Sequence, residues 1–164
     1  MFDLVKIWVK APILKNADLL IVSKCLQWVN PEIFKELSEG RVTLTYCPEE
    51  EPQLAYGKIA SIVRSSRPKS ITVVTIDGSP HCFTLHAAVN EAAYILGEKI
   101  PRKHYVVLDA EKLVEISPEA VRIARYLSLV EELIKKNMWI LQELKKHSLE
   151  YKKALETSDA KFQN

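Results

Sequence analysis

The sequence has few features of a nucleotide-binding or nucleic-acid-binding protein. Only four of its 164 residues are glycine, so it carries no glycine-rich dinucleotide fingerprint, and no stretch matches the phosphate-binding loop with its Lys-Ser/Thr pair. The 23 Lys and Arg residues are nearly balanced by 21 Asp and Glu, which leaves a formal charge of +2. A charge this small does not steer nucleic acid or an anionic membrane surface toward the protein. We therefore expect neither as a partner.

The sequence also lacks a membrane span, a secretory leader and an even set of cysteines. No run approaches the roughly 18 apolar residues of a spanning helix, and Asp3 stands where a leader would carry basic residues. The three cysteines are widely spread, which suits free thiols or metal ligands in a reducing compartment better than disulfides. With 48% hydrophobic and 27% charged residues, we expect a globular cytoplasmic protein.

Short apolar runs alternate with longer segments of helical period from residue 18 onward. Strands are predicted at residues 18–23, 41–46, 70–76, 105–108 and 112–116. The first helix begins at Asn30-Pro31-Glu32 and ends at Gly40, the second bears Leu54 and ends near Ser66, and the third runs from Ser79-Pro80 to Gly97. The opening segment, residues 2–14, fits an edge strand or a short helix.

Strands that alternate with helices at this spacing form a mostly parallel sheet with helices on both faces. The sequence therefore predicts an α/β domain over residues 1–116. Its expected architecture is a three-layer, Rossmann-like or flavodoxin-like fold with a sheet of four to five strands.

Residues 117–164 are expected to form a long C-terminal helical extension. Ser117-Pro118-Glu119 repeats the helix-start pattern, and no glycine or proline follows it up to Glu156. A heptad-like seam contains Leu127, Val130, Ile134, Asn137, Leu141, Leu144, Ser148, Tyr151 and Leu155. One interpretation is a single long helix in a dimeric coiled coil; the other is a break near 146–148 that gives a helical hairpin. Further apolar residues, from Leu129 to Ile140, favour a homo-oligomer in either case.

Each cysteine follows a predicted strand. Cys25 comes after the first strand, Cys47 after the second and Cys82 after the third. Because the carboxyl ends of parallel strands lie at one edge of a sheet, the three thiols are predicted to converge there. His81 precedes Cys82 and His86 lies one helical turn beyond it, so these five side chains are the candidate metal ligands. Three cysteines and a histidine suit zinc, and three cysteines with a fourth ligand suit an iron–sulfur cluster.

Other interpretations of the same residues remain open. Free cysteine is among the most buried residue types, and Cys82 continues the apolar stripe of Leu85 and Val89, so the thiols can be core residues. Cys82 at a helix N-terminus, assisted by His81 or His86, can also be a reactive nucleophile. The run Glu49-Glu50-Glu51 suits a general acid/base cluster or a cation site, but such runs are usually solvated. A non-catalytic, homo-oligomeric scaffold is the alternative function.

The three cysteine-bearing loops resemble those of a known redox subunit. The segments Cys25-Leu26-Gln27-Trp28, Tyr46-Cys47-Pro48 and Asp77-Gly78-Ser79-Pro80-His81-Cys82 are similar to the iron–sulfur delta subunit of viologen-reducing hydrogenases, over residues 17–115. The resemblance implies that Cys25, Cys47 and Cys82 hold an iron–sulfur cluster and that the chain passes electrons to a redox partner. This sequence lacks the additional loop cysteines of that family, because Val29 and Asn30 follow Trp28. The leading hypothesis is an α/β redox or metal-binding module.

Overall fold

The computed structural model describes residues 1–51, 55–97 and 100–161. They belong to two compact units, Met1–Val121 and Arg122–Asn164. The strands are β1 (Phe2–Asp3), β2 (Asp18–Ser23), β3 (Val42–Tyr46), β4 (Ser70–Ile76), β5 (Arg102–Leu108) and β6 (Lys112–Ile116). The helices of the first unit are η1 (Pro12–Leu14), α1 (Leu26–Val29), α2 (Pro31–Ser38), α3 (Ala55–Ser66), α4 (Phe83–Leu96) and α5 (Pro118–Ile123), the last of which crosses the unit boundary.

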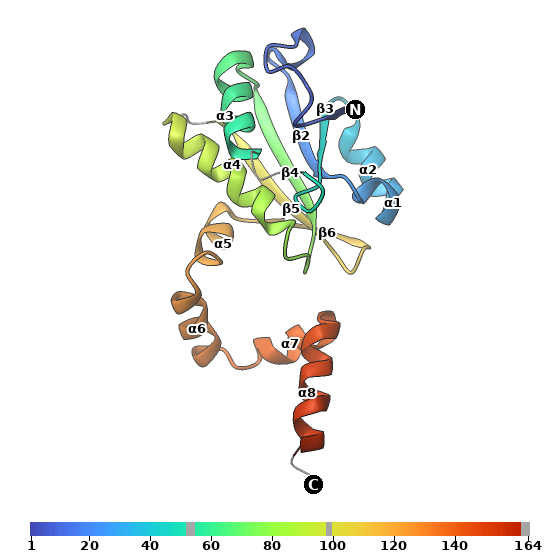
Figure 1. Ribbon diagram of the computed structural model, residues 1–164, viewed down its shortest axis with the longest axis vertical. Coiled ribbons are helices and arrows are strands. Elements are labelled where there is room, and N and C mark those ends of the chain that lie inside the picture. Colours follow the sequence, from blue (N-terminus) through green and yellow to red (C-terminus); the bar gives the residue numbers. More distant parts are fainter. Residues whose placement is uncertain (52–54, 98–99, 162–164) are drawn as a thin grey trace. The chain divides into compact units, whose positions relative to one another are not determined.

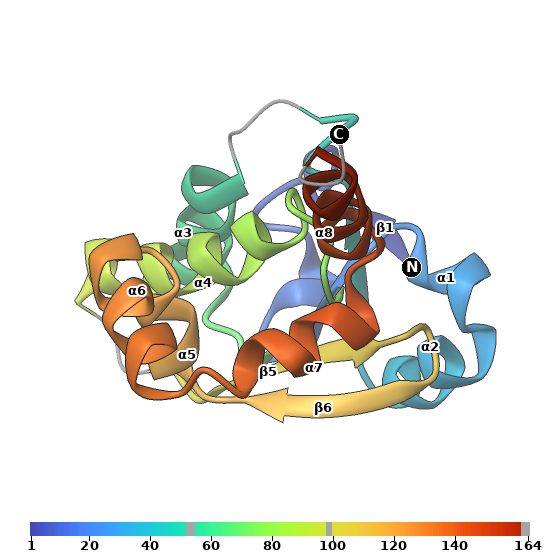
Figure 2. The ribbon, with the colours of Figure 1, turned by 90° about the horizontal axis from the view of Figure 1, so that it is seen from below.

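The first unit contains one mixed sheet in the order β1-β3-β2-β4-β5-β6. All neighbouring strands are parallel except β5 and β6, which form an antiparallel hairpin and run side by side in Figure 2. In the centre, Ile21 of β2 pairs with Leu44 of β3 and with Val73 of β4. The sixth strand is the edge strand proposed for residues 2–14, where Phe2–Asp3 pairs along β3. The same segment also contains the short helix η1, so both interpretations of it are confirmed.

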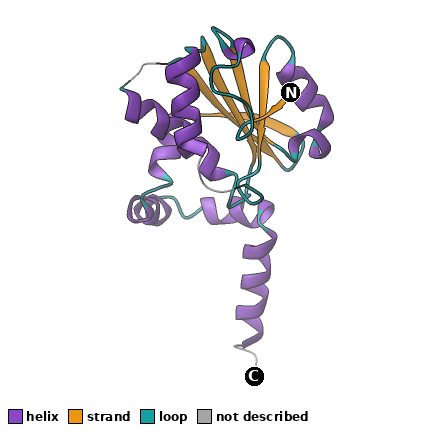
Figure 3. Cartoon of the chain, turned by 45° about the horizontal axis from the view of Figure 1, so that its top comes forward, coloured by secondary structure: helices purple, strands orange, loops and turns teal. Residues whose placement is uncertain are grey.

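Helices cover both faces of this sheet, which confirms the predicted three-layer α/β fold (Figures 1 and 3). The larger core lies between the sheet and α3 and α4, and it contains Ile21, Ile59 and Leu85. A smaller core lies on the opposite face under α1 and α2. The central strands β2 and β4 are buried on both faces, which explains their continuous apolar sequences.

Several helix ends follow from local signals in the sequence. The Asn30 side chain accepts a 3.0 Å hydrogen bond from the Ile33 backbone N–H at the start of α2. Gly97 ends α4 in the left-handed conformation, at φ 62°. In contrast, α4 begins at Phe83 and not at the predicted Ser79-Pro80. Leu54, expected in the second helix, lies outside the described residues.

The C-terminal unit contains several short helices, so the prediction of one continuous helix is wrong. After α5, the chain forms α6 (Leu127–Lys136), α7 (Ile140–His147) and α8 (Leu149–Lys161). The predicted break near 146–148 is present: Ser148 ends α7, and its hydroxyl accepts a hydrogen bond from the Tyr151 N–H in the first turn of α8. A second break follows α6 at Asn137, whose side chain donates to the Leu133 carbonyl. Among the helices described, none has the length and hydropathy that crossing a bilayer requires.

Candidate thiol site at the carboxyl edge of the sheet

The strand order places a switch point between β2 and β4. The chain moves outward from β2 to β3, then crosses back to β4 on the other side of β2. In open α/β sheets, ligands bind at the carboxyl ends of the strands where the order reverses in this way. Ser23 is the last residue of β2 and Cys82 follows β4, and the Ser23 Oγ and Cys82 Sγ atoms are 3.2 Å apart. A thiol is therefore hydrogen bonded at the switch point.

The other two thiols lie in the neighbouring loops, and all three cysteines are free. Cys82 is 6% exposed, while Cys25 and Cys47 are half-buried. Burial raises the pKa of Cys25. The charges of Cys82 and Cys47 and a side-chain hydrogen bond with Cys82 raise this pKa further. The raised pKa keeps the Cys25 thiol protonated at neutral pH.

The acidic run after β3 connects the three cysteine-bearing loops. The Glu50 carboxylate accepts a 2.6 Å hydrogen bond from Lys24 Nζ, beside Cys25. The Glu49 Oε2 atom lies 3.7 Å from the Nδ1 atom of His81, and His81 belongs to the loop that contains Cys82. Glu51 folds back to accept a 3.3 Å bond from the Cys47 backbone N–H, and burial raises the pKa of its carboxyl group.

The sequence predicts a solvated patch here, with an acid/base cluster or a cation site as the alternatives. The side chains of Glu49 and Glu50 are 74% and 60% exposed, so these two carboxylates are solvated. Their contacts reach the loops of His81 and Lys24, whereas Glu51 contacts its own loop.

The two candidate histidines lie in different environments. The His81 side chain is 56% exposed and faces Glu49 at the surface. His86 is buried, and both of its ring nitrogens are engaged: Nε2 is 2.8 Å from Thr75 Oγ1 and Nδ1 is 3.0 Å from His104 Nδ1. His86 is therefore occupied in the core, and we do not include it in the candidate site.

The buried histidine pair is a feature that the sequence analysis missed. Burial lowers the pKa of His86 to about 3, and His104 lowers it further by its charge. His86 is therefore neutral at physiological pH, and one imidazole N–H of the pair can donate to the other ring. One signal was available: His86 lies between Leu85 and Val89 on the apolar face of α4, where an ordinary surface histidine would not be placed.

Two of the ligands predicted for zinc or an iron–sulfur cluster, Cys82 and His86, have other partners in the described structure. Within residues 1–51, 55–97 and 100–161, no group of three His, Cys, Asp or Glu side chains is arranged to hold a metal ion. Zinc sulfurs lie about 2.3 Å from the metal and hence about 4 Å from one another. Cys82 is instead paired with Ser23, and the ring nitrogens of His86 are paired inside the core.

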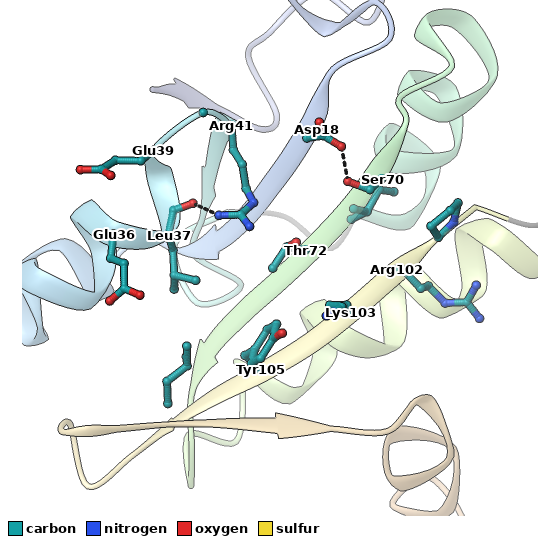
Figure 4. A pocket seen from close by; sticks show the side chains of 14 residues that line it. Asp18, Glu36, Leu37, Glu39, Arg41, Ser70, Thr72, Arg102, Lys103 and Tyr105 are labelled. Carbon is teal, nitrogen blue, oxygen red and sulfur yellow. Dashed lines mark hydrogen bonds between the residues drawn. The ribbon is translucent and has the colours of Figure 1, made fainter.

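A pocket of about 700 Å³ lies at the opposite, amino-terminal end of the strands (Figure 4). Its walls carry charges of both signs, but several are already paired. Asp18 accepts a hydrogen bond from Ser70, Arg41 donates to the Leu37 carbonyl, and Arg102 donates to Asn90. Three of its charged side chains are thus engaged within the fold, and the thiol edge, which lies at the switch point, is the candidate site.

Comparison with known proteins places the chain in a family. A family model described as a Rossmann-like domain matches residues 11–162. The chain therefore belongs to this Rossmann-like domain family, in agreement with the sheet and its covering helices. Neither the curated proteins nor the solved structures contain a match.

Proposed function

We propose that this protein is a thiol-based redox module in which Cys25 and Cys82 form a reversible disulfide. The observation that carries the proposal is the position of both cysteines at the switch point of the sheet: the Cys82 Sγ atom lies 3.2 Å from the Oγ atom of Ser23, two residues before Cys25. The influence of Cys82 on the pKa of Cys25 supports it, because it raises that pKa. The expected co-reactant is a disulfide on a small thiol compound or on a redox protein partner.

The different exposure of the two thiols defines their roles. Cys25 is half-buried and can be reached from solvent, whereas Cys82 is 6% exposed. The Cys25 thiolate attacks one sulfur of the incoming disulfide, forms a mixed disulfide and releases the first thiol. Cys82 then attacks the Cys25 sulfur and releases the second. Two protein thiols lose two electrons and two protons in total, and one disulfide is reduced to two thiols.

Reaction with glutathione disulfide tests this assignment. Reduced full-length protein is incubated with the reagent, and the cysteine linkages are mapped by mass spectrometry of peptides. We expect a Cys25–Cys82 disulfide in the natural sequence and in Cys47→Ser, which is the matched control. Cys82→Ser should accumulate a glutathione adduct on Cys25, because the resolving thiol is missing. A stable adduct on Cys25 in the natural sequence, or pairing of Cys47 with either thiol, contradicts the proposal.

Metal analysis distinguishes this function from the metal-binding alternative. In that alternative Cys25, Cys47 and Cys82 bind the metal, since three thiolates make a soft ligand set. Anaerobically purified protein should contain no stoichiometric zinc and no absorption band near about 400 nm, which an iron–sulfur cluster would give. Stoichiometric metal that is lost in Cys25→Ser, Cys47→Ser and Cys82→Ser alike would replace the disulfide proposal.

A further inference from the structure

The sheet face that packs against α2 carries polar side chains toward the amino ends of its strands. Alternate residues of a strand point to the same face. On this face Thr72 precedes Val74 in β4, and Lys103 and Tyr105 precede Val107 in β5. Both valines belong to the smaller core. The three polar side chains instead line the cavity of Figure 4, and all of its walls belong to the first unit.

Three side chains on these walls have hydrogen-bond donors that a ligand can use. Thr72 is only 7% exposed, and no described residue hydrogen bonds its hydroxyl group. The exposed Lys103 ammonium has no ion-pair partner within the described part of the chain. Arg41 uses one guanidinium N–H on the Leu37 carbonyl, at 2.7 Å, and this bond leaves its other donors available. Because a buried hydroxyl group is costly without a partner, Thr72 in particular points to an occupant of the cavity.

The acidic side chains of the cavity do not compete for these donors. Asp18 already accepts a 2.6 Å hydrogen bond from the Ser70 hydroxyl. Glu36 and Glu39 are exposed, and in Figure 4 both lie on the far side of Arg41 from strand β5. The part of the cavity toward β5 is therefore positively charged.

We propose that this cavity binds the phosphate monoester of a small organic molecule. Such a phosphate carries about two negative charges at neutral pH, which match the charges of Arg41 and Lys103. Its oxygens can accept hydrogen bonds from both cations and from Thr72, whereas a carboxylate would leave one of the cations unmatched. The apolar body of the ligand would contact Leu37 and Leu113. The volume of about 700 Å³ is that of an ordinary ligand pocket.

Phenyl phosphate is the probe for this site, because it joins a phosphate monoester to an apolar body. The full-length protein in a phosphate-free buffer is titrated with it, and two-dimensional amide NMR spectra are recorded. We expect saturable shifts for the amides of residues 71–73 and 102–104. The amides of residues 23–25, at the opposite end of the strands, should not shift. This binding is independent of the thiol chemistry proposed for that end.

Three substitutions remove one donor each. Arg41→Gln, Lys103→Gln and Thr72→Val should each weaken phenyl phosphate binding about tenfold or more, because each removes a hydrogen bond to a charged group. The matched control is Lys35→Gln, which removes an exposed lysine of α2 that does not line the cavity. It should retain the natural affinity. Arg41 and Lys103 are exposed, so these two variants test the site even where Thr72→Val does not fold.

Several results would overturn the assignment. They are the absence of saturable binding up to about 10 mM phenyl phosphate, shifts confined to residues outside the cavity, and undiminished affinity in Arg41→Gln and Lys103→Gln. An equal loss of affinity in Lys35→Gln would show that the probe responds only to surface charge. Benzoate is the carboxylate counterpart of the probe, and binding as tight as that of phenyl phosphate would exclude selection of a phosphate.

Discussion

Cys25 illustrates how neighbouring side chains set the reactivity of a single residue. A cysteine near the end of a strand could be activated by a helix dipole, which lowers its pKa. Here burial and the other two thiols act in the opposite direction and raise the pKa of Cys25. The reactive form of this thiol therefore becomes abundant only at alkaline pH.

Removal of Cys82 should shift the pKa of Cys25 toward its ordinary value. The substitution removes the charge and the side-chain hydrogen bond of Cys82, which both raise this pKa. The rate of iodoacetamide labelling of Cys25 is measured against pH by peptide mass spectrometry. In Cys47→Ser/Cys82→Ala the rate should level off at lower pH than in the control, Cys47→Ser. Identical pH profiles in the two variants would show that Cys82 does not affect Cys25.

His86 should make the stability of the fold depend on pH in the acidic range. Its pKa in the folded protein is about 3, below the ordinary value of 6.5. The unfolded chain therefore binds the extra proton first, and stability is lost as pH falls from about 6.5 toward 3. The loss contributed by this group is at most about 1.4 kcal/mol per pH unit. Urea unfolding at a series of pH values should show a shallower dependence for His86→Gln than for the natural sequence. His81→Gln, an exposed control, should retain the natural slope.

The sequence could indicate the positions of the thiols but not the side chains that surround them. Cys25, Cys47 and Cys82 each follow a strand, so the topology alone brings their loops to one edge. The pairing of His86 with His104 depends on the packing of α4 against β5, for which no short-range pattern exists. The same holds for Glu49 and Glu50, which contact loops that are distant in the sequence.

At the scale of the elements, the first unit was predictable because its boundaries are marked locally. Asn30 caps α2, Gly97 ends α4, and the continuous apolar runs of β2 and β4 correspond to strands buried on both faces. The C-terminal helices were not predictable in the same way. Their sequence contains no breaker residue, and the breaks occur at Asn137 and Ser148, whose side chains bond to the nearby backbone.

Two glycine substitutions should have opposite effects on stability. Gly97 has φ 62°, a conformation that strains other residues, so Gly97→Ala should destabilise the protein by about 1 kcal/mol. Gly57 lies inside α3, and a Cβ atom built there meets no described atom within 4 Å. Gly57→Ala should therefore stabilise the protein by about 0.5–1 kcal/mol. Urea unfolding measures both changes. Equal changes of the same sign would contradict the conformational argument.

At the scale of the whole molecule, the two units differ in how they are stabilised. The first unit has two apolar cores on opposite faces of its sheet, whereas α6 and α7 contain no buried side chain. Because packing supplies most of the stability of short helices, the C-terminal unit should open more easily than the sheet.

Amide hydrogen exchange should resolve this difference along one chain. At concentrations at which the protein is monomeric, amides of β2 and β4 should exchange only through global unfolding, and those of α6 should exchange orders of magnitude faster. Mass spectrometry of peptides from the exchanged protein measures the protection of both elements in one experiment. Protection of α6 equal to that of β2 in the monomer would mean that this helix is stabilised within the single chain.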